Sequence, residues 1–178
     1  MDRPLLERQL AQLPLLRYEF FDTSELVFSQ KVRHICETEC PMYGRTWACP
    51  PAVGTVEECR RRVLAYPHGL MILSAAEVAD AADLEETLAT REDHEVLARQ
   101  VRDWMRQQGL EVLALSTEAC TLCETCAWPG GPCRQPERML PCVESHGILV
   151  TALAERYGID FLAGGNLVTW YSLLLYRE

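Results

Sequence analysis

The chain has 178 residues, enough for a domain that removes about 70% of its unfolded surface from water. Hydrophobic residues make up 48% of the sequence and charged residues 24%, a globular composition that excludes disordered, collagen-like and solenoid architectures. The formal net charge is -9, and because nucleic-acid binding needs a basic surface, we expect no nucleic-acid partner.

The first half of the chain alternates regular elements with segments rich in turn residues. A capping box of Thr55 and Glu58 marks the start of one helix, and leucines at helical spacing mark another near the N-terminus. The predicted elements are an N-terminal helix, an extended segment over 16–29 with a turn at 22–24, a loop over 36–54, a helix over 55–66 and a strand over 69–76.

The second half continues the same alternation. Glycines at 109 and 158 give two helical patterns a C-terminal stop. The predicted elements are one or two helices over 84–109, a strand over 110–116, a helix over 142–158 and a long strand over 166–176.

Strands that alternate with helices predict an α/β or α+β fold. We expect a single layered domain over residues 1–178, with a mixed sheet of about four strands and helices packed on it. Two cysteine-rich metal loops, at 36–59 and 120–142, complete this interpretation.

The expected cellular compartment decides whether the cysteines are free thiols or disulfides. No segment reaches about 18 consecutive apolar residues, and polar residues interrupt the N-terminal stretch, so we expect no signal peptide, no membrane contact and a cytoplasmic location. Thiols stay reduced there, and dense cysteines indicate metal ligands or redox groups before disulfides. The nine cysteines are also an odd number, so they cannot all pair within one chain.

The second cysteine loop has the pattern C-x2-C-x2-C-x6-C. Its members are Cys120, Cys123, Cys126 and Cys133. Overlapping two-residue spacings wrap the chain around an object several ångströms across, as in ferredoxin loops, whereas zinc usually takes two separate C-x2-C knuckles. We therefore predict a [4Fe-4S] cluster here. The Pro-Gly-Gly turn at 129–131 either returns Cys133 to this cluster or directs it to the first loop.

The first loop holds a second candidate site. Its predicted ligands are Cys36, Cys40, Cys49 and Cys59. Proline follows both Cys40 and Cys49 and fixes the turn as the chain leaves each sulfur. Cys59 falls in the first turn of a helix, where the dipole favours a thiolate, so it is either a fourth ligand or a buried side chain. Cys142 is expected to be a small buried hydrophobic residue.

A dithiol role is the other interpretation of the second loop, because Cys123-Glu-Thr-Cys126 is also a C-x-x-C motif. The overlapping third thiol and the proline–glycine turn fit a thioredoxin-like site poorly.

The segments "CETECPMYGRTWACPP" (36–51) and "CTLCETCAWPGGPCRQPERMLPCVESHGILV" (120–150) resemble a prokaryotic family described as predicted metal-binding proteins of unknown function. The family resembles this chain in a first cysteine block that ends in Cys-Pro-Pro and in a second block C-x2-C-x2-C-x6-C-Arg. The resemblance implies metal binding and little about a reaction. The ligands that it implies are Cys36, Cys40, Cys49, Cys120, Cys123, Cys126 and Cys133. Cys142 stands where the family is expected to have serine, and Cys59 lies outside its motifs.

Other residues near the loops have weaker roles. His34 and His146 are candidate supporting or substitute ligands, whereas His94, among acidic residues, is expected to be solvated. The residues flanking the loops are Arg45, Trp47, Trp128, Arg134 and Arg138. We interpret the tryptophans as shields against water, and the arginines as groups that raise a cluster potential, bind an anion or simply face solvent.

Three functions fit these observations. The first is an electron-transfer protein, typical of an anaerobe, that carries one or two [4Fe-4S] clusters and docks its acidic surface on a redox partner protein. The second is an iron–sulfur enzyme in which Cys36, Cys40 and Cys49 leave one iron open for a small substrate. The third is a structural zinc protein.

Overall fold

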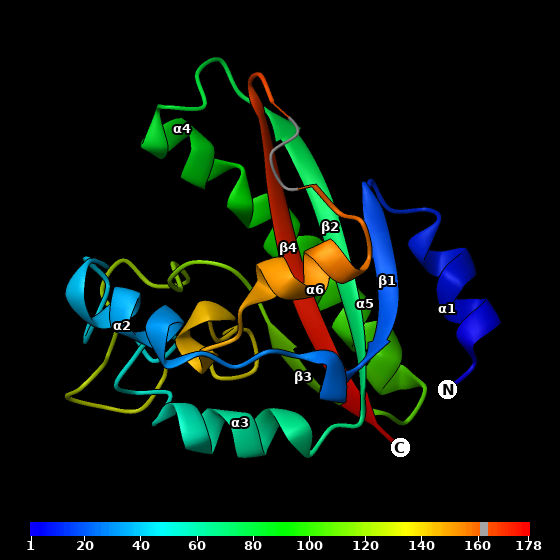
Figure 1. The fold of residues 1–178 in the computed structure, drawn as a ribbon, viewed down its shortest axis with the longest axis horizontal. Helices are drawn as coiled ribbons and strands as arrows, with labels where there is room; N and C mark the ends of the chain where they lie inside the picture. Colours follow the sequence, from blue (N-terminus) through cyan, green and yellow to red (C-terminus); the bar gives the residue numbers. More distant parts are fainter. Residues whose placement is uncertain (161–163) are drawn as a thin grey trace.

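A four-stranded sheet forms the centre of the computed structural model, which describes residues 1–160 and 164–178 (Figure 1). The strands are β1 (Arg17–Asp22), β2 (His68–Glu77), β3 (Glu111–Leu115) and β4 (Leu167–Arg177). They lie in the order β1-β2-β4-β3, and the three neighbouring pairs are antiparallel. The predicted fold class and the four strands are confirmed, but the expectation of a mixed sheet is wrong.

The position of β4 explains the antiparallel pairing. Both β2 and β3 run antiparallel to β4, so they run in the same direction as each other. The helical connection between them leaves a gap one strand wide, and β4 fills it. Alternation of strands and helices along the sequence indicates this crossover, but it does not show which later strand enters the gap.

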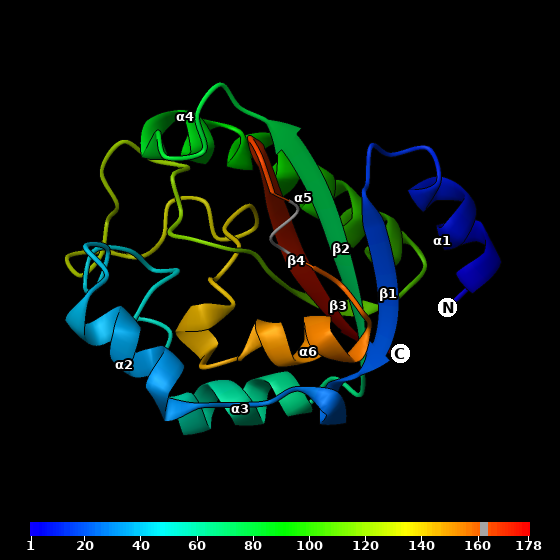
Figure 2. The same ribbon diagram turned by 45° about the horizontal axis from the view of Figure 1, so that its top comes forward.

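Helices cover both faces of the sheet. They are α1 (Arg3–Leu10), α2 (Gln30–Thr38), α3 (Val56–Leu64), α4 (Leu84–Ala89), α5 (Arg91–Gln107) and α6 (Val150–Arg156), with 3-10 helices η1 (Thr23–Glu25) and η2 (Glu144–His146). Figures 1 and 2 show α5 on one face and α6 on the other. Leu6 and Leu10 of α1 join the core under α5, whereas Val63 and Leu153 join the opposite core. Among the described residues, no helix is both long and apolar enough to span a membrane.

The predicted start of α3 is confirmed by its cap. The backbone N–H of Glu58 donates to Thr55 Oγ1 at 3.2 Å, and the backbone N–H of Thr55 donates to Glu58 Oε2 at 2.7 Å. This reciprocal pair satisfies two donors that the first helical turn leaves open. It also fixes the point at which the first cysteine segment joins the helix.

The expected loop over 36–54 begins later than predicted, because α2 extends through Cys36. Residues 30–38 contain neither proline nor glycine, and Ser29 caps the helix by accepting a hydrogen bond from the backbone N–H of Lys31 at 3.2 Å. Pro41 is the first residue that stops the helical pattern. Cys36 is therefore presented from a helix, and Cys40 follows its end.

The helix predicted over 142–158 is also shorter than expected. Gly147, at φ 72°, separates η2 from α6. A Cβ atom at this glycine would lie 3.0 Å from Val56 Cγ1, so the close approach to α3 requires glycine here. Cys142 consequently lies outside any helix, in an isolated parallel bridge with Ser116.

Gly69 of β2 lies opposite Phe21 of β1, whose ring covers it. A Cβ atom at position 69 would lie 2.2 Å from Phe21 Cζ. We expect Gly69→Ala to lower the free energy of unfolding by about 1–3 kcal/mol through overpacking, as measured by urea denaturation. Adding Phe21→Leu should recover part of this loss because it removes the ring. Equal stability of Gly69→Ala and wild type would contradict this account.

Candidate metal centre

The two cysteine segments lie beside each other on one side of the sheet, in both views of the fold (Figures 1 and 2). Hydrogen bonds join them. The backbone N–H of Cys142 donates to Ala48 O at 3.1 Å, and Trp47 Nε1 donates to Gly131 O at 3.1 Å. Segments that are distant in sequence therefore form one cysteine-rich region.

The second loop brings its four predicted ligands to a single cavity. The residues that line it include Cys120, Cys123, Cys126 and Cys133, with Trp47 and Met139. Trp47 packs edge-to-face on Trp128, with ring centroids 4.7 Å apart, and the role of both tryptophans as shields stays a prediction. Burial raises the pKa of the Cys120 thiol above its usual value, so metal binding there must displace a firmly held proton.

Three polar side chains that follow Cys133 hold the backbone of the second loop. Gln135 Nε2 donates to Leu122 O at 2.8 Å, and Arg138 Nη1 donates to Gln135 Oε1 at 2.8 Å. Arg134 Nη1 donates to Thr125 O at 2.9 Å. Arg134 and Arg138, which the sequence placed beside the loop, thus bind its carbonyls or its supporting amide.

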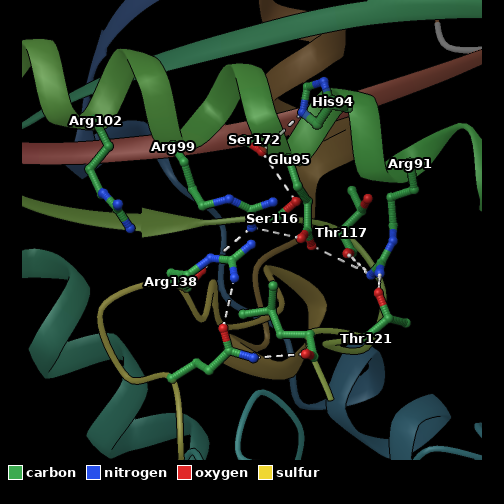
Figure 3. Close-up of polar contacts among 12 residues, drawn as sticks. Arg91, His94, Glu95, Arg99, Arg102, Ser116, Thr117, Thr121, Arg138 and Ser172 are labelled. Atoms are coloured by element: carbon green, nitrogen blue, oxygen red, sulfur yellow. Dashed lines mark hydrogen bonds and ion pairs between the residues drawn. The ribbon is translucent and has the colours of Figure 1, made fainter. Parts of the chain in front are cut away.

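A buried arginine on α5 supports the start of the same loop (Figure 3). Arg91, with 2% of its side chain exposed, donates to the carbonyls of Thr117 and Ala119 and, at 2.6 Å, to Thr121 Oγ1. Glu95 is its counterion, 3.5 Å away. Sequence reasoning missed this role, because charges at the helical spacing of Arg91 and Glu95 usually mark a solvated face.

Glu95 lies between two arginines of α5, since Arg99 Nη1 also contacts it at 2.9 Å. Figure 3 shows Glu95 facing both guanidinium groups, with Arg99 toward Arg138. Arg99 Nη1 donates to Arg138 O at 3.4 Å. This ion-pair network connects α5 to both ends of the second cysteine segment.

The expectation that His94 is solvated is wrong, because only 1% of the residue is exposed. Its ring lies 2.7 Å from Ser74 Oγ and 2.9 Å from Ser172 Oγ, and Ser172 donates to Ser116 Oγ at 3.3 Å. Burial lowers the pKa of His94 to about 4, so the ring is neutral at pH 7. This polar chain fixes α5 against the end of β3, from which the second loop departs.

The first cysteine site opens into a separate cavity of about 220 Å³. The residues that line it include Cys36, Cys40, Cys49 and Cys142, with the carboxylates of Glu118 and Glu144. Burial raises the pKa of Cys36 above its usual value and that of Cys49 to about 11. Three of the four cysteines predicted as ligands of this site therefore line one cavity. The fourth cysteine there is Cys142, which was expected to be a small buried hydrophobic residue.

Cys59 lies apart from this cavity, on the buried face of α3. Its thiol donates to Val53 O at 3.4 Å and receives Arg33 Nη2 at 3.7 Å. Its role as a ligand stays a prediction.

The two candidate histidines have different surroundings. His34 is exposed, whereas His146 is buried with Nδ1 at 2.8 Å from Cys142 O. Burial lowers the pKa of His146 to about 4. His146 thus supports the backbone of Cys142 instead of lining either cysteine cavity.

Thiols suit this region to particular metals. In the described part of the chain, no three His, Cys, Asp or Glu side chains are close enough together to hold a single ion. Two groups of four sulfurs nevertheless line one cavity each, and thiolates are the ligands that iron–sulfur clusters and zinc prefer. The donor set therefore fits the cofactors predicted from the spacing.

The fold and the two cysteine cavities define a cysteine-rich α/β protein equipped with soft metal ligands. A model of the family described as predicted metal-binding protein (DUF2284) matches residues 19–176, and the chain belongs to that family. No curated protein and no solved structure matches the chain. The resemblance to a family of predicted metal-binding proteins is thus confirmed, while the individual ligands stay predictions.

Proposed function

We propose that the chain is an electron-transfer protein whose second loop holds a [4Fe-4S] cluster through Cys120, Cys123, Cys126 and Cys133. The observation that carries this proposal is that all four cysteines line one cavity, together with Trp47 and Met139. The overlapping two-residue spacings favour a multi-iron cluster over a single zinc ion. The arginine and glutamine contacts to the loop backbone would hold the sulfurs in place as the cluster changes charge.

The acidic surface supports a proposal about the partner. With a net charge of -9, the chain would be attracted to a basic redox protein and repelled by nucleic acid and by anionic lipid surfaces. We place this exchange in the cytoplasm, where thiols remain reduced.

The first cavity supports a second candidate function. Three predicted ligands, Cys36, Cys40 and Cys49, line this cavity. From its volume of about 220 Å³ we infer that a small molecule would fit next to these cysteine side chains. A [4Fe-4S] cluster held there by only three cysteines would leave its fourth iron open, and that iron would act on the small molecule as a Lewis acid. A structural zinc site is the third candidate, distinguished by metal content.

Anaerobic purification followed by metal and sulfide analysis tests the proposal. We expect about four irons with matching sulfide for one cluster, or about eight for two. Cys126→Ser should lower the iron content of this site from about four to about three or fewer because it deletes a central ligand of the second loop. Glu124→Gln is the matched control, since it changes an exposed side chain of the same loop without removing a sulfur. A colourless protein with stoichiometric zinc would overturn the iron–sulfur proposal.

A further inference from the structure

We propose that Cys142 supplies the fourth sulfur of the first cysteine site, beside Cys36, Cys40 and Cys49. The inference rests on the proposed function in one respect, since it takes the group bound in this cavity to be an iron–sulfur cluster. It assigns a role to a cysteine that the sequence motifs leave out, and it gives the first site a complete set of sulfur ligands.

The backbone places Cys142 beside Cys49. Its N–H donates at 3.1 Å to the carbonyl of Ala48, the residue that precedes Cys49, and its bridge with Ser116 anchors it to the end of β3. Cys142 is one of the residues that line the same cavity as Cys36, Cys40 and Cys49. Four cysteines from three separate segments of the chain thus line one space of about 220 Å³.

All three side chains of η2 contact Cys142. Ser145 Oγ donates to the Cys142 carbonyl, and His146 Nδ1 lies 2.8 Å from the same oxygen. The Cys142 sulfur lies 2.9 Å from Glu144 Oε2, and the other oxygen of Glu144 accepts a hydrogen bond from Tyr171. The backbone of Cys142 is therefore held in one position, whereas the contact with Glu144 is made by the thiol and would break when the sulfur loses its proton to bind iron.

Cys59 does not have these properties. Its residue is 0% exposed, and its sulfur is engaged by Val53 O and Arg33, away from the cavity. The two cysteines are both buried and differ chiefly in whether they face the other sulfurs. Cys59 is therefore a matched control for Cys142.

Four thiolates would complete the ligand set of a [4Fe-4S] cluster, each thiol releasing its proton as its sulfur binds iron. No iron of such a cluster would be left open by the protein. A site completed by Cys142 therefore favours electron transfer over the Lewis-acid enzyme at this cavity. The acidic side chains Glu118 and Glu144 beside it would lower the tendency of an already anionic cluster to accept an electron.

The test isolates each site in the full chain. Cys120→Ser with Cys126→Ser disables the second loop, and anaerobic reconstitution with ferrous iron and sulfide then reports on the first cavity alone. We expect this background protein to bind about four irons and four sulfides. Adding Cys142→Ser should lower the iron content to about three or fewer and change the electron paramagnetic resonance spectrum, whereas adding Cys59→Ser should leave both unchanged.

Three results would overturn the inference: a background protein that binds no iron, a Cys142→Ser variant that keeps the background iron and spectrum, or a Cys59→Ser variant that loses them. Far-ultraviolet circular dichroism on the same samples establishes that each variant is folded. The converse chain, with Cys36→Ser and Cys49→Ser, reports on the second loop by itself. Failure of that chain to bind iron would refute the proposed function without bearing on Cys142.

Discussion

Arg91→Met should lower the free energy of unfolding by about 3–5 kcal/mol, because it breaks a buried ion pair and leaves buried carbonyls without a donor. In the native protein this guanidinium binds the carbonyls of Thr117 and Ala119, the hydroxyl of Thr121 and the carboxylate of Glu95. Urea denaturation measures the change. Iron content after anaerobic reconstitution should also fall, since the same contacts position the entry to the second loop.

Arg106→Met provides the comparison on the same helix. Its side chain is 42% exposed and pairs with Glu137 near the surface, so we expect a loss below about 1 kcal/mol. If Arg91→Met cost no more than Arg106→Met, the buried network would not support the loop as described.

His94 should make the protein less stable in mild acid. Burial lowers its pKa to about 4 from an ordinary 6.5, so between these values the unfolded chain binds a proton that the folded chain does not. Stability is therefore complete above about pH 6.5 and falls as the pH drops toward 4. The expected loss from this group is about 2 kcal/mol between pH 7 and pH 5.

His94→Gln removes this proton-binding group and keeps a polar side chain between Ser74 and Ser172. Urea denaturation at pH 7 and pH 5 should show a loss about 2 kcal/mol smaller for the variant than for wild type. His34→Gln is the control, because it replaces an exposed imidazole and removes no buried base. A variant as acid-sensitive as wild type would contradict the assignment.

Local patterns predicted much of this molecule. Cysteine spacing identified the four sulfurs that share the second cavity, and the Thr55 capping box located the start of α3 correctly. Such features depend on residues that are close in sequence, where chain geometry alone decides what can meet.

Features that depend on long-range packing were missed. Cys142 lines the first cavity in a segment that hydrogen-bonds to Ala48, ahead of the break at Gly147 between η2 and α6. The burial of Arg91 and His94 depends on how α5 lies on the sheet, which the charged sequence around them conceals. The sequence around Arg91 and His94 contains no local signal that distinguishes a buried polar contact from a solvated helix face.

The place of β4 in the sheet also sets an order of events during synthesis. β3 pairs only with β4 among the described strands, and the second cysteine loop leaves from the end of β3. Because a chain emerges from its N-terminal end first, all nine thiols leave the ribosome before β4, the strand that pairs with β3. The growing chain therefore exposes its cysteines to oxidants and stray metals before the sheet is complete, and loading of the proposed clusters would follow the emergence of β4.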